Sequence, residues 1–437
     1  MILQNGHRWK VEKSKQIVTT SFAGIPLLSE LAHQTGVIAE LDSIPHLWRR
    51  TGTYTTADYV MSLALTLTAG GDGLEDTRTL AGDPGLGQLV FPGMPKPNSL
   101  GGFLRRFGQR SLLRLGEIVT RQAMRALKPG QTVTIDYDSS VIESGKSDAK
   151  RSYKGVDGYN PLLAWIDGLD MFAGGVFREG NASPQSHLRS LLRYCHRRLP
   201  EGVRCRFRSD SAGYRADVIR YCDRHAIEFA IRADLDTAVM GVIEKIPEKA
   251  WQLVVRGNDV FLLAETVHVP GNTRNDPRLR LPAFRLVVIR RTGQLDLFKK
   301  PVEYYPILTS LPESFNAENV VDFYNGRGRM EKAIGELKNG FGLHWLPCGD
   351  LFANAAYFQT ALLAYNLART FKRVALPEGW RAFAIKKLRF RLLCHAGVIV
   401  RHARRLILRL SQSFPSFEVF ETARWNVLSP QLAPAVT

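Results

Sequence analysis

The spacing of apolar positions divides the chain into stretches of different character. Over residues 1–128, apolar residues recur mainly at helical spacing, most clearly in 25–41 and 59–67. A stretch rich in Gly and Pro, 82–97, predicts a loop, and a shorter helix over 100–107 follows it. We therefore predict a helical N-terminal lobe over residues 1–128.

The short helix after this loop begins near two residues that favour helix N-termini. Either Asn98 or Ser99 could cap it, and Arg105 and Arg106 lie on it. Two short helices with interleaved arginines could form a helix-turn-helix, although a helical lobe without that role is the commoner arrangement.

Residues 129–235 change to strand-like alternation, beginning with the sequence TVTIDYD. The predicted strands are 132–138, 162–166, 172–177, 204–209 and 228–232, and the predicted helices between them are 187–198 and 215–225. Three strands, a helix, a strand, a helix and a strand is the element order of a ribonuclease H-like core. We therefore predict an α/β fold whose core begins here.

The remaining residues divide into three further stretches. Residues 236–315 have a β-rich pattern, with a hairpin signal at Gly257-Asn258-Asp259, and are predicted to form an insertion in the core. Residues 316–375 return to helical spacing, including a predicted helix from Asn316 to Asn339. Residues 376–437 form a basic C-terminal segment, in which 381–394 is predicted to be helical and 398–400 and 406–410 could pair as a hairpin around a basic bend.

The charge of the chain points to a polyanionic partner. Of its 437 residues, 59 are Lys or Arg and 41 are Asp or Glu, a net charge of +18. The stretch 381–410 contains nine Lys and Arg, among them Arg404 and Arg405, and no acid. DNA or RNA is therefore favoured over an anionic membrane surface, and a basic factor bound to ribosomes remains an alternative.

Neither a disulfide framework nor a membrane span is predicted. The five cysteines form no CxxC pair, the N-terminus is polar, and the longest uncharged stretches are too short to cross a bilayer. His196, His225 and His344 stand apart in the sequence, which gives no zinc spacing. A cytoplasmic protein is expected.

One predicted helix carries a row of residues suited to phosphodiester chemistry. Tyr324, Arg327, Glu331 and Lys338 would lie within about 60° of one another on a continuous helix. The carboxylate could hold a metal ion while the phenol and the cations bind neighbouring phosphates. A surface helix with ion pairs explains the same spacing, and Glu336 would then be an equivalent exposed charge.

The spacing of these four residues resembles the signature of a large group of bacterial insertion-sequence transposases. Tyrosine, arginine, glutamate and lysine match this YREK signature of the DDE transposases (DDE domain group 1) at every spacing, within YNGRGRMEKAIGELKNGFG. The resemblance extends over roughly residues 95–410 and is strongest at 132–142, 204–214 and 321–370. It implies a ribonuclease H-like enzyme that cleaves the ends of its element and joins them to target DNA.

The resemblance also implies a catalytic and metal-binding triad of Asp138, Asp210 and Glu331. Asp210 follows a predicted strand, in the sequence RSDSAGY. Asp136 is an alternative to Asp138 as the first acid of the triad, because residues two apart on a strand face the same side of the sheet. The family pattern of an aspartate before two small residues favours Asp138-Ser139-Ser140, and Asp136 then remains the alternative.

The cofactors and partners follow from this resemblance. Two Mg²⁺ ions, with Mn²⁺ as a substitute, are expected on the three carboxylates. The partner is expected to be double-stranded DNA, both the terminal inverted repeats of the element and the target, held by a homodimer in the bacterial nucleoid, with no membrane. The predicted DNA contacts are Tyr324, Arg327, Lys338, Arg105, Arg106, Arg404, Arg405 and Trp251, with Tyr304 and Tyr305 as alternatives to Trp251 for holding a flipped base.

Three other functions remain open on the sequence. A nuclease of the same fold would cut without joining, and an inactive DNA-binding derivative would be expected to have lost an acid. An aspartic protease is a remote third, because neither Asp138-Ser139-Ser140 nor Asp210-Ser211-Ala212 has the glycine that its motif requires.

Overall fold

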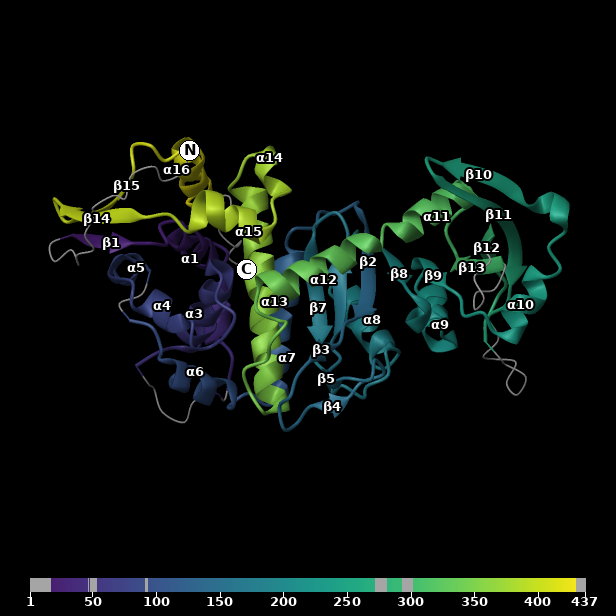
Figure 1. Ribbon diagram of the computed structural model, residues 1–437, viewed down its shortest axis with the longest axis horizontal. Helices are drawn as coiled ribbons and strands as arrows, with labels where there is room; N and C mark the ends of the chain where they lie inside the picture. Colours follow the sequence, from purple (N-terminus) through teal and green to yellow (C-terminus); the bar gives the residue numbers. More distant parts are fainter. Residues whose placement is uncertain are drawn as a thin grey trace, which may run out of the picture.

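The computed structural model describes residues 17–45, 47, 53–90, 93–271, 281–292 and 302–429. The molecule is elongated, with a helical lobe at one end, a sheet in the middle and a group of antiparallel strands at the other end (Figure 1). The polar N-terminus, 1–16, and the last residues of the C-terminal segment, 430–437, lie outside the described residues. Within the described residues, no helix is long and apolar enough to span a membrane.

The helical N-terminal lobe is confirmed, with three differences in detail. Its elements are β1 (Val18–Thr20), α1 (Ile25–Gln34), α2 (Val37–Asp42), α3 (Thr56–Ala69), α4 (Thr77–Ala81), α5 (Pro84–Leu89), α6 (Pro97–Leu104) and α7 (Gln109–Met124). The helix predicted over 25–41 is broken at Gly36, whose φ of 75° is left-handed. The predicted loop contains α5, which Asp83 caps, and α6 begins at Pro97 in its first turn rather than after Asn98 or Ser99.

The central sheet has the ribonuclease H-like topology that the element order predicts. Its elements are β2 (Thr132–Ser139), β6 (Leu162–Ile166), β7 (Met171–Val176), α8 (Leu188–His196), β8 (Arg204–Ser209), α9 (Ala216–Arg224) and β9 (Glu228–Arg232). The strand order is β7-β6-β2-β8-β9, in which β6 is antiparallel to its neighbours while β2, β8 and β9 run parallel. A small sheet of β3 (Ile142–Glu143), β5 (Asp157–Tyr159) and β4 (Lys150–Arg151) lies in the β2–β6 connection.

The β-rich stretch after β9 extends the same sheet. It contains α10 (Thr237–Ile243), β10 (Gln252–Arg256), β11 (Asp259–His268), β12 (Phe284–Thr292) and β13 (Val302–Thr309). These strands form an antiparallel meander, and β13 pairs with β9, so that nine strands form one sheet. The predicted hairpin between β10 and β11 is present, with Gly257 at φ 59° in its turn.

The helix predicted from Asn316 to Asn339 is two helices, α11 (Ala317–Asn325) and α12 (Gly328–Gly340). The Arg208 guanidinium bonds the Phe323 carbonyl, and the Arg327 N–H bonds the Tyr324 carbonyl instead. A Cβ on Gly326 would clash with the Arg208 guanidinium, so the glycine permits this approach. The turn between α11 and α12 therefore tightens around a buried arginine.

Helix α13 (Leu351–Val374) lies between the helical lobe and the central sheet. Nearly all of it is buried, and it packs against α3, α7 and β7 (Figure 1). Asn366 satisfies the backbone of Phe172, accepting from its N–H and donating to its carbonyl, each at 2.9 Å. The helical lobe and the central sheet therefore share one hydrophobic core.

The basic C-terminal segment returns to the helical lobe. Its elements are α14 (Glu378–Arg381), α15 (Ile385–Leu388), a π-helical turn (Arg389–Leu393), β14 (Gly397–His402), β15 (Arg405–Leu410) and α16 (Phe417–Val427). The predicted β14–β15 hairpin is confirmed, whereas the single helix expected up to Cys394 is interrupted. Because β14 also pairs with β1, the C-terminal segment packs against the helical lobe.

Candidate active site

Two of the predicted acids lie side by side at the carboxyl ends of neighbouring parallel strands. In the β2–β8 register Asp136 pairs with Arg208 and Tyr137 with Ser209, so Asp138 and Asp210 are the next residues along. Asp210 follows the last residue of β8 and accepts from the Ala212 N–H at 3.0 Å, which caps a short 3₁₀ turn. The fold thus brings together two carboxylates that are 72 residues apart.

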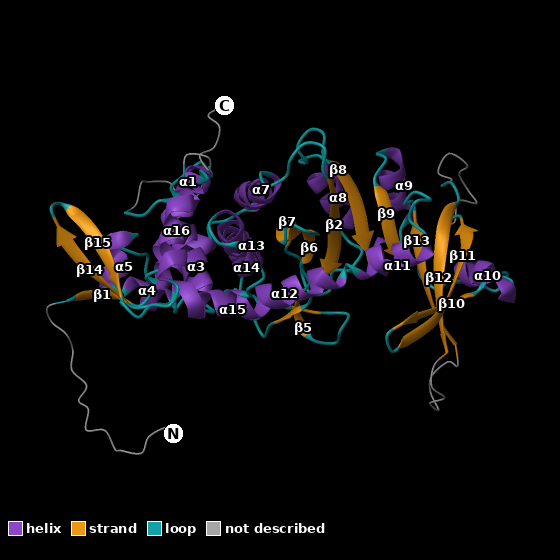
Figure 2. Ribbon diagram, turned by 90° about the horizontal axis from the view of Figure 1, so that it is seen from above, coloured by secondary structure: helices purple, strands orange, loops and turns teal. Residues whose placement is uncertain are grey.

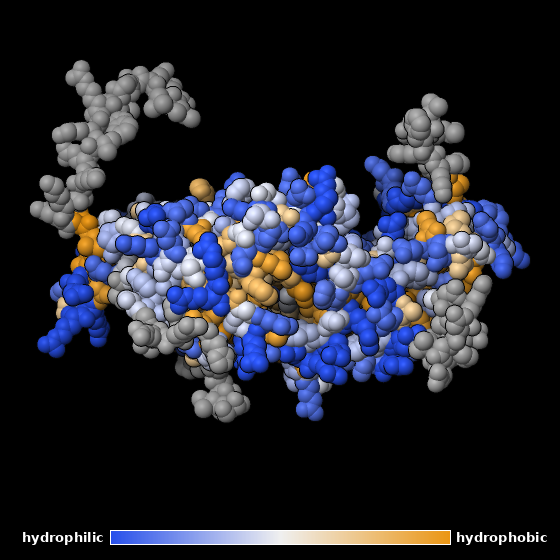
Figure 3. Space-filling model, turned by 90° about the horizontal axis from the view of Figure 1, so that it is seen from below, coloured by the Kyte–Doolittle hydropathy of each residue, from blue (hydrophilic) through white to orange (hydrophobic). Residues whose placement is uncertain are grey.

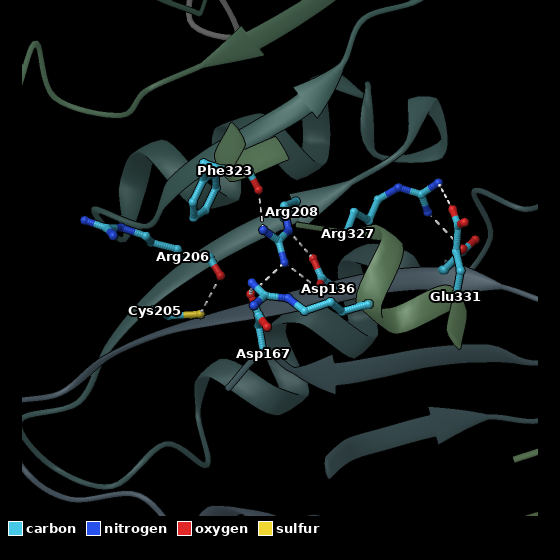
Figure 4. A network of polar contacts seen from close by, with 10 residues as sticks. Asp136, Asp167, Cys205, Arg206, Arg208, Phe323, Arg327 and Glu331 are labelled. Carbon is cyan, nitrogen blue, oxygen red and sulfur yellow. Dashed lines mark hydrogen bonds and ion pairs between the residues drawn. The ribbon is translucent and has the colours of Figure 1, made fainter. Parts of the chain in front are cut away.

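Arg327 joins Asp138 to the third predicted acid. It donates to Asp138 Oδ2 at 2.8 Å and to Glu331 Oε1 at 2.7 Å. The arginine side chain is 16% exposed and that of Asp138 17%, whereas that of Glu331 is 56% exposed. Glu331 therefore faces solvent at the first turn of α12, and Arg327 bonds both it and Asp138. Figure 4 shows Arg327 pointing toward Glu331.

Burial dominates the electrostatics of Asp138. Burial, together with the nearby Asp210 carboxylate, raises the pKa of Asp138 to about 6, although Arg327 opposes the shift. The pKa of Arg327 is raised by Asp138, Tyr324, Asp210 and Glu331 in spite of its burial. One guanidinium therefore serves as the counter-ion of all three acids.

Asp136 belongs to a different, fully buried network. Arg208 donates to its two oxygens at 2.5 and 2.8 Å and to Asp167 at 3.0 Å, and it also reaches the Phe323 carbonyl (Figure 4). The side chains of Asp136 and Arg208 are 0% and 1% exposed, and Arg329 reaches Asp167 from outside. This network ties β2, β8 and α11 together beneath the three acids.

Lys338 and two residues of the β4–β5 region border the acids. The Lys338 Nζ donates to the Val141 carbonyl at 2.7 Å, and burial and the neighbouring Lys154 lower the pKa of Lys338. Burial and the charges of Asp138 and Asp210 raise the pKa of Tyr153. The sequence does not predict that Tyr153 and Lys154 lie near the acids, because nothing in their local pattern connects this loop to the three carboxylates.

Tyr324 is not part of an exposed row with the other three signature residues. It lies at the end of α11, before the tightened turn, and only 3% of it is exposed. Its ring packs against Tyr305, with the centroids 6.0 Å apart, and burial raises its pKa. The prediction of one continuous helix face is therefore wrong at this residue.

Glu336 is also not the exposed charge that the sequence suggests. Its side chain is 15% exposed, pairs with Arg369 at 2.5 Å, and accepts from the Ile385 N–H at 2.7 Å. The glutamate fastens α12 to α13 and α15.

The remaining predicted DNA contacts lie away from the three acids. Arg105 and Arg106 are exposed at the end of α6. Arg404 and Arg405 are exposed at the tip of the β14–β15 hairpin, where Ala403 and Arg404 have left-handed φ values of 46° and 63°. Both pairs belong to the end of the molecule formed by the helical lobe (Figure 1).

The aromatic residues predicted to hold a flipped base lie at the other end of the sheet. Trp251 is half-buried, and Arg290 stacks over it at 4.3 Å. Tyr304 and Tyr305 line a cavity of about 880 Å³ between the β10–β13 strands and α11, together with Arg232, whose guanidinium lies 4.1 Å from the Tyr305 ring. Trp251 does not line this cavity.

The histidines do not all stand apart in space. The rings of His196 and His225 lie 5.3 Å apart, and His196 Nδ1 is 3.1 Å from the Tyr221 hydroxyl. Among the described residues, no three His, Cys, Asp or Glu side chains are close enough together to hold a metal ion as they stand. Asp138, Asp210 and Glu331 are therefore grouped around Arg327 without forming a closed ligand cage.

Comparisons with known proteins identify the family of the chain. The sequence model of the family described as transposase DDE domain group 1 matches residues 11–429. A solved structure of the piggyBac transposase synaptic complex with hairpin DNA matches with a TM-score of 0.47 and 14% identity, over 85% of this chain and 79% of that chain. No curated protein matches the sequence.

Proposed function

Because the chain belongs to the transposase DDE domain group 1 family, we propose that it is a DNA transposase that binds the terminal inverted repeats of a bacterial insertion sequence, cleaves there, and joins the freed ends to target DNA. The observation that supports this most directly is the grouping of three acids from distant parts of the chain. Asp138 ends β2, Asp210 follows β8, and Glu331 lies on α12, all around Arg327.

The three acids fit a divalent metal ion in chemistry and charge. They offer only oxygen ligands, which Mg²⁺ and Mn²⁺ prefer, and Arg327 is the one cation that forms ion pairs with them among the described residues. Asp138, Asp210 and Glu331 would hold two ions once Arg327 gives up its bonds to Asp138 and Glu331. Bound there, divalent ions polarise the phosphodiester and activate the attacking oxygen.

The cations around the acids are proposed to position the DNA strand. Arg327 is released toward solvent when Asp138 and Glu331 bind cations, and its planar donors then suit a phosphate. Lys338 lies within the electrostatic reach of Asp138 and supplies a second positive charge. Tyr324, buried against Tyr305, is proposed to support Arg327 and to reach DNA only if α11 and α12 shift.

The cavity at the far end of the sheet is proposed to receive an unstacked base. Tyr304 and Tyr305 provide aromatic faces there, and Arg232 provides positive charge. Trp251, which the sequence singles out, packs under Arg290 and is a weaker candidate for this role. A homodimer that pairs two element ends completes the proposal.

A nuclease that cuts without joining is the closest alternative. The two activities separate when the purified protein is given pre-cleaved element ends and a target plasmid. Joined products in Mg²⁺ support transposition, whereas cleavage of uncut ends without any joining would indicate the nuclease.

Cleavage is expected to require a divalent metal ion. With DNA from both flanks of the coding region as substrate, Mg²⁺ or Mn²⁺ should support cleavage and EDTA should abolish it, because three carboxylates repel the phosphodiester without a cation. Calcium should support binding more than turnover, since its coordination is looser. Full cleavage in EDTA would rule out the metal-dependent mechanism.

The exposed hairpin arginines are expected to contribute to the salt dependence of end binding. Arg404→Ala with Arg405→Ala should make the slope of log affinity against log salt shallower by up to about 0.9 for each phosphate that is no longer neutralised. Binding is measured by fluorescence anisotropy over a range of salt concentrations. An unchanged slope would show that the hairpin does not touch DNA.

A further inference from the structure

Two rows of arginine line a cavity on the side of the sheet away from α12. Arg189, Arg193 and Arg197 follow one another at intervals of four on α8, and Arg220 and Arg224 do the same on α9. The two helices pack against each other, and these five residues, the α8–α9 arginine cluster, surround a cavity of about 270 Å³. In Figure 2, α8 and α9 lie along one side of the sheet and α11 and α12 along the other.

The cluster is held in place by the cores of both helices. The opposite face of α8 buries Leu188, Leu191 and Leu192 against the sheet, and α9 buries Val218 and Ile219. The arginine rows must therefore face outward. Hydrophilic side chains also dominate much of the lower face of the molecule (Figure 3).

The charges of Arg189, Arg193, Arg197 and Arg224 are poorly compensated within the described part of the chain. Among the described residues, Asp217 is the one acid that lines the cavity, and both of its oxygens accept from Arg215, at 2.9 and 3.2 Å. No carboxylate in the described part of the chain forms an ion pair with Arg189, Arg193, Arg197 or Arg224. By contrast Arg198, next along α8, pairs with Glu117 at 3.0 Å.

This arrangement costs stability and therefore needs a reason. Like charges four residues apart on a helix repel each other, and each row repeats that spacing. Burial is the main cause of the lowered pKa of His196 beside the cluster, and the charges of His225 and Arg197 add to it. A fold that keeps five arginines at one cavity is arranged for an external polyanion.

The far part of the cluster, Arg197 and Arg224 at the C-terminal ends of α8 and α9, is separated from the three acids by the length of these helices. Both α8 and α9 connect parallel strands, so each runs back from the carboxyl edge of the sheet, where Asp138 and Asp210 lie, toward the opposite edge. From Ala216 to Arg224 this is a rise of about 12 Å. Arg197 and Arg224 therefore lie beyond the reach of a strand held only at the acids.

We propose that the α8–α9 arginine cluster binds the phosphate backbone of duplex DNA outside the segment that reaches the three acids. The inference rests on the proposed function in taking DNA as the polyanion. Arginine suits this role because its planar donors grip phosphate oxygens in pairs. Either a separate target duplex or an extension of the bound element end supplies the same phosphate chemistry.

The test compares two triple variants that remove the same charge. The cluster variant is Arg193→Ala, Arg197→Ala and Arg224→Ala. The control is Arg78→Ala, Arg114→Ala and Arg424→Ala, whose side chains are 62%, 61% and 58% exposed and already paired with glutamates. Binding to a long duplex of unrelated sequence is measured by anisotropy in EDTA over a range of salt concentrations.

The cluster variant should bind at least about tenfold more weakly at physiological salt, and its slope should be shallower by up to about 0.9 for each phosphate left without an arginine. The control should change little. Arg→Lys at the same three positions should keep most of the slope, because the slope counts charges. Equal losses in the cluster and control variants, or a lysine variant as weak as the alanine variant, would overturn the proposal.

Two element-end duplexes identify which DNA the cluster holds. One duplex contains only the segment that reaches the three acids, and the other extends well beyond that segment. Beside the loss for the unrelated duplex, a loss of affinity for the extended end but not for the short end assigns the cluster to flanking DNA. Unchanged affinity for both element ends assigns it to the target. Because binding is read in EDTA, a parent protein that binds but never cleaves would contradict the proposed function and leave this inference standing.

Discussion

Glu331→Gln is expected to abolish cleavage and joining, with a loss of about a thousandfold or more, while binding to the element ends persists. Glutamine keeps the size and helix propensity of glutamate and can still accept one bond from Arg327, but it removes the negative charge that a metal ion requires. The basic residues that contact DNA are untouched. The measurement is strand cleavage in Mg²⁺, alongside end binding in Ca²⁺.

The structure provides a closely matched control for this variant. Glu318 lies in the first turn of α11, its side chain is 52% exposed, and it pairs with Arg256 at 3.0 Å, much as the 56% exposed Glu331 pairs with Arg327. Glu318→Gln should keep activity within a few-fold of the parent, since an exposed ion pair contributes under about 1 kcal/mol. Glu336 is unsuitable, because it is buried against Arg369.

A direct reading of metal binding makes the result more specific. Mg²⁺ should raise the melting temperature of the parent and of Glu318→Gln, because a ligand that binds only the folded state stabilises it. Glu331→Gln should show a smaller rise. Normal cleavage by Glu331→Gln, or equal loss in both variants, would contradict the assignment of Glu331 as the third acid.

The sequence predicts the core of this fold well because its signals are local. Every predicted strand from 132 to 232 is present with bounds that differ by at most one residue, since strands of an α/β core are short and bounded by turns. The hairpins at Gly257 and at Arg404 were also predictable, because glycine and a basic bend mark them in the sequence.

The features that the sequence could not reveal depend on contacts between distant residues. The break between α11 and α12 results from Arg208, 115 residues away, which takes the Phe323 carbonyl. The pairing of β1 with β14 brings together two strands that are far apart in the sequence. Neither contact leaves a periodic pattern in the sequence. From the sequence alone, an arginine in a strand is expected to be exposed, and a strand as short as β1 gives no sign of its partner.

The same limit applies to the first acid. Asp136 and Asp138 share a strand face, and sequence spacing alone cannot separate them. In the structure they have different partners: Asp136 meets Arg208 in the buried network, and Asp138 meets Arg327 beside Asp210. Burial raises the pKa of both carboxyls, so the two asparagine variants differ in the guanidinium that each leaves behind: Arg208 is fully buried, whereas Arg327 keeps Glu331 as a partner.

Asp138→Asn is expected to stabilise the metal-free protein at pH 8. A carboxyl whose pKa rises from 3.8 to about 6 on folding is held less favourably when ionised. Folding of the parent therefore loses stability as the pH rises from about 4 to 6 and stays lower above that. Asparagine avoids this cost, which amounts to at most about 3 kcal/mol. The melting temperatures of parent and variant in EDTA should differ at pH 8 and converge near pH 4.

Asp136→Asn should instead lower the melting temperature at both pH values. It leaves the guanidinium of Arg208 buried with Asp167 as its remaining carboxylate, and breaking a buried pair in this way costs about 3 kcal/mol. Both variants should lose cleavage, Asp138→Asn through the lost ligand and Asp136→Asn through the disturbed fold. Only Asp138→Asn should also lose the stabilisation by Mg²⁺. If Asp138→Asn cleaves at the parent rate, or if Asp136→Asn keeps the parent melting temperature but no longer responds to Mg²⁺, then Asp136 is the first acid.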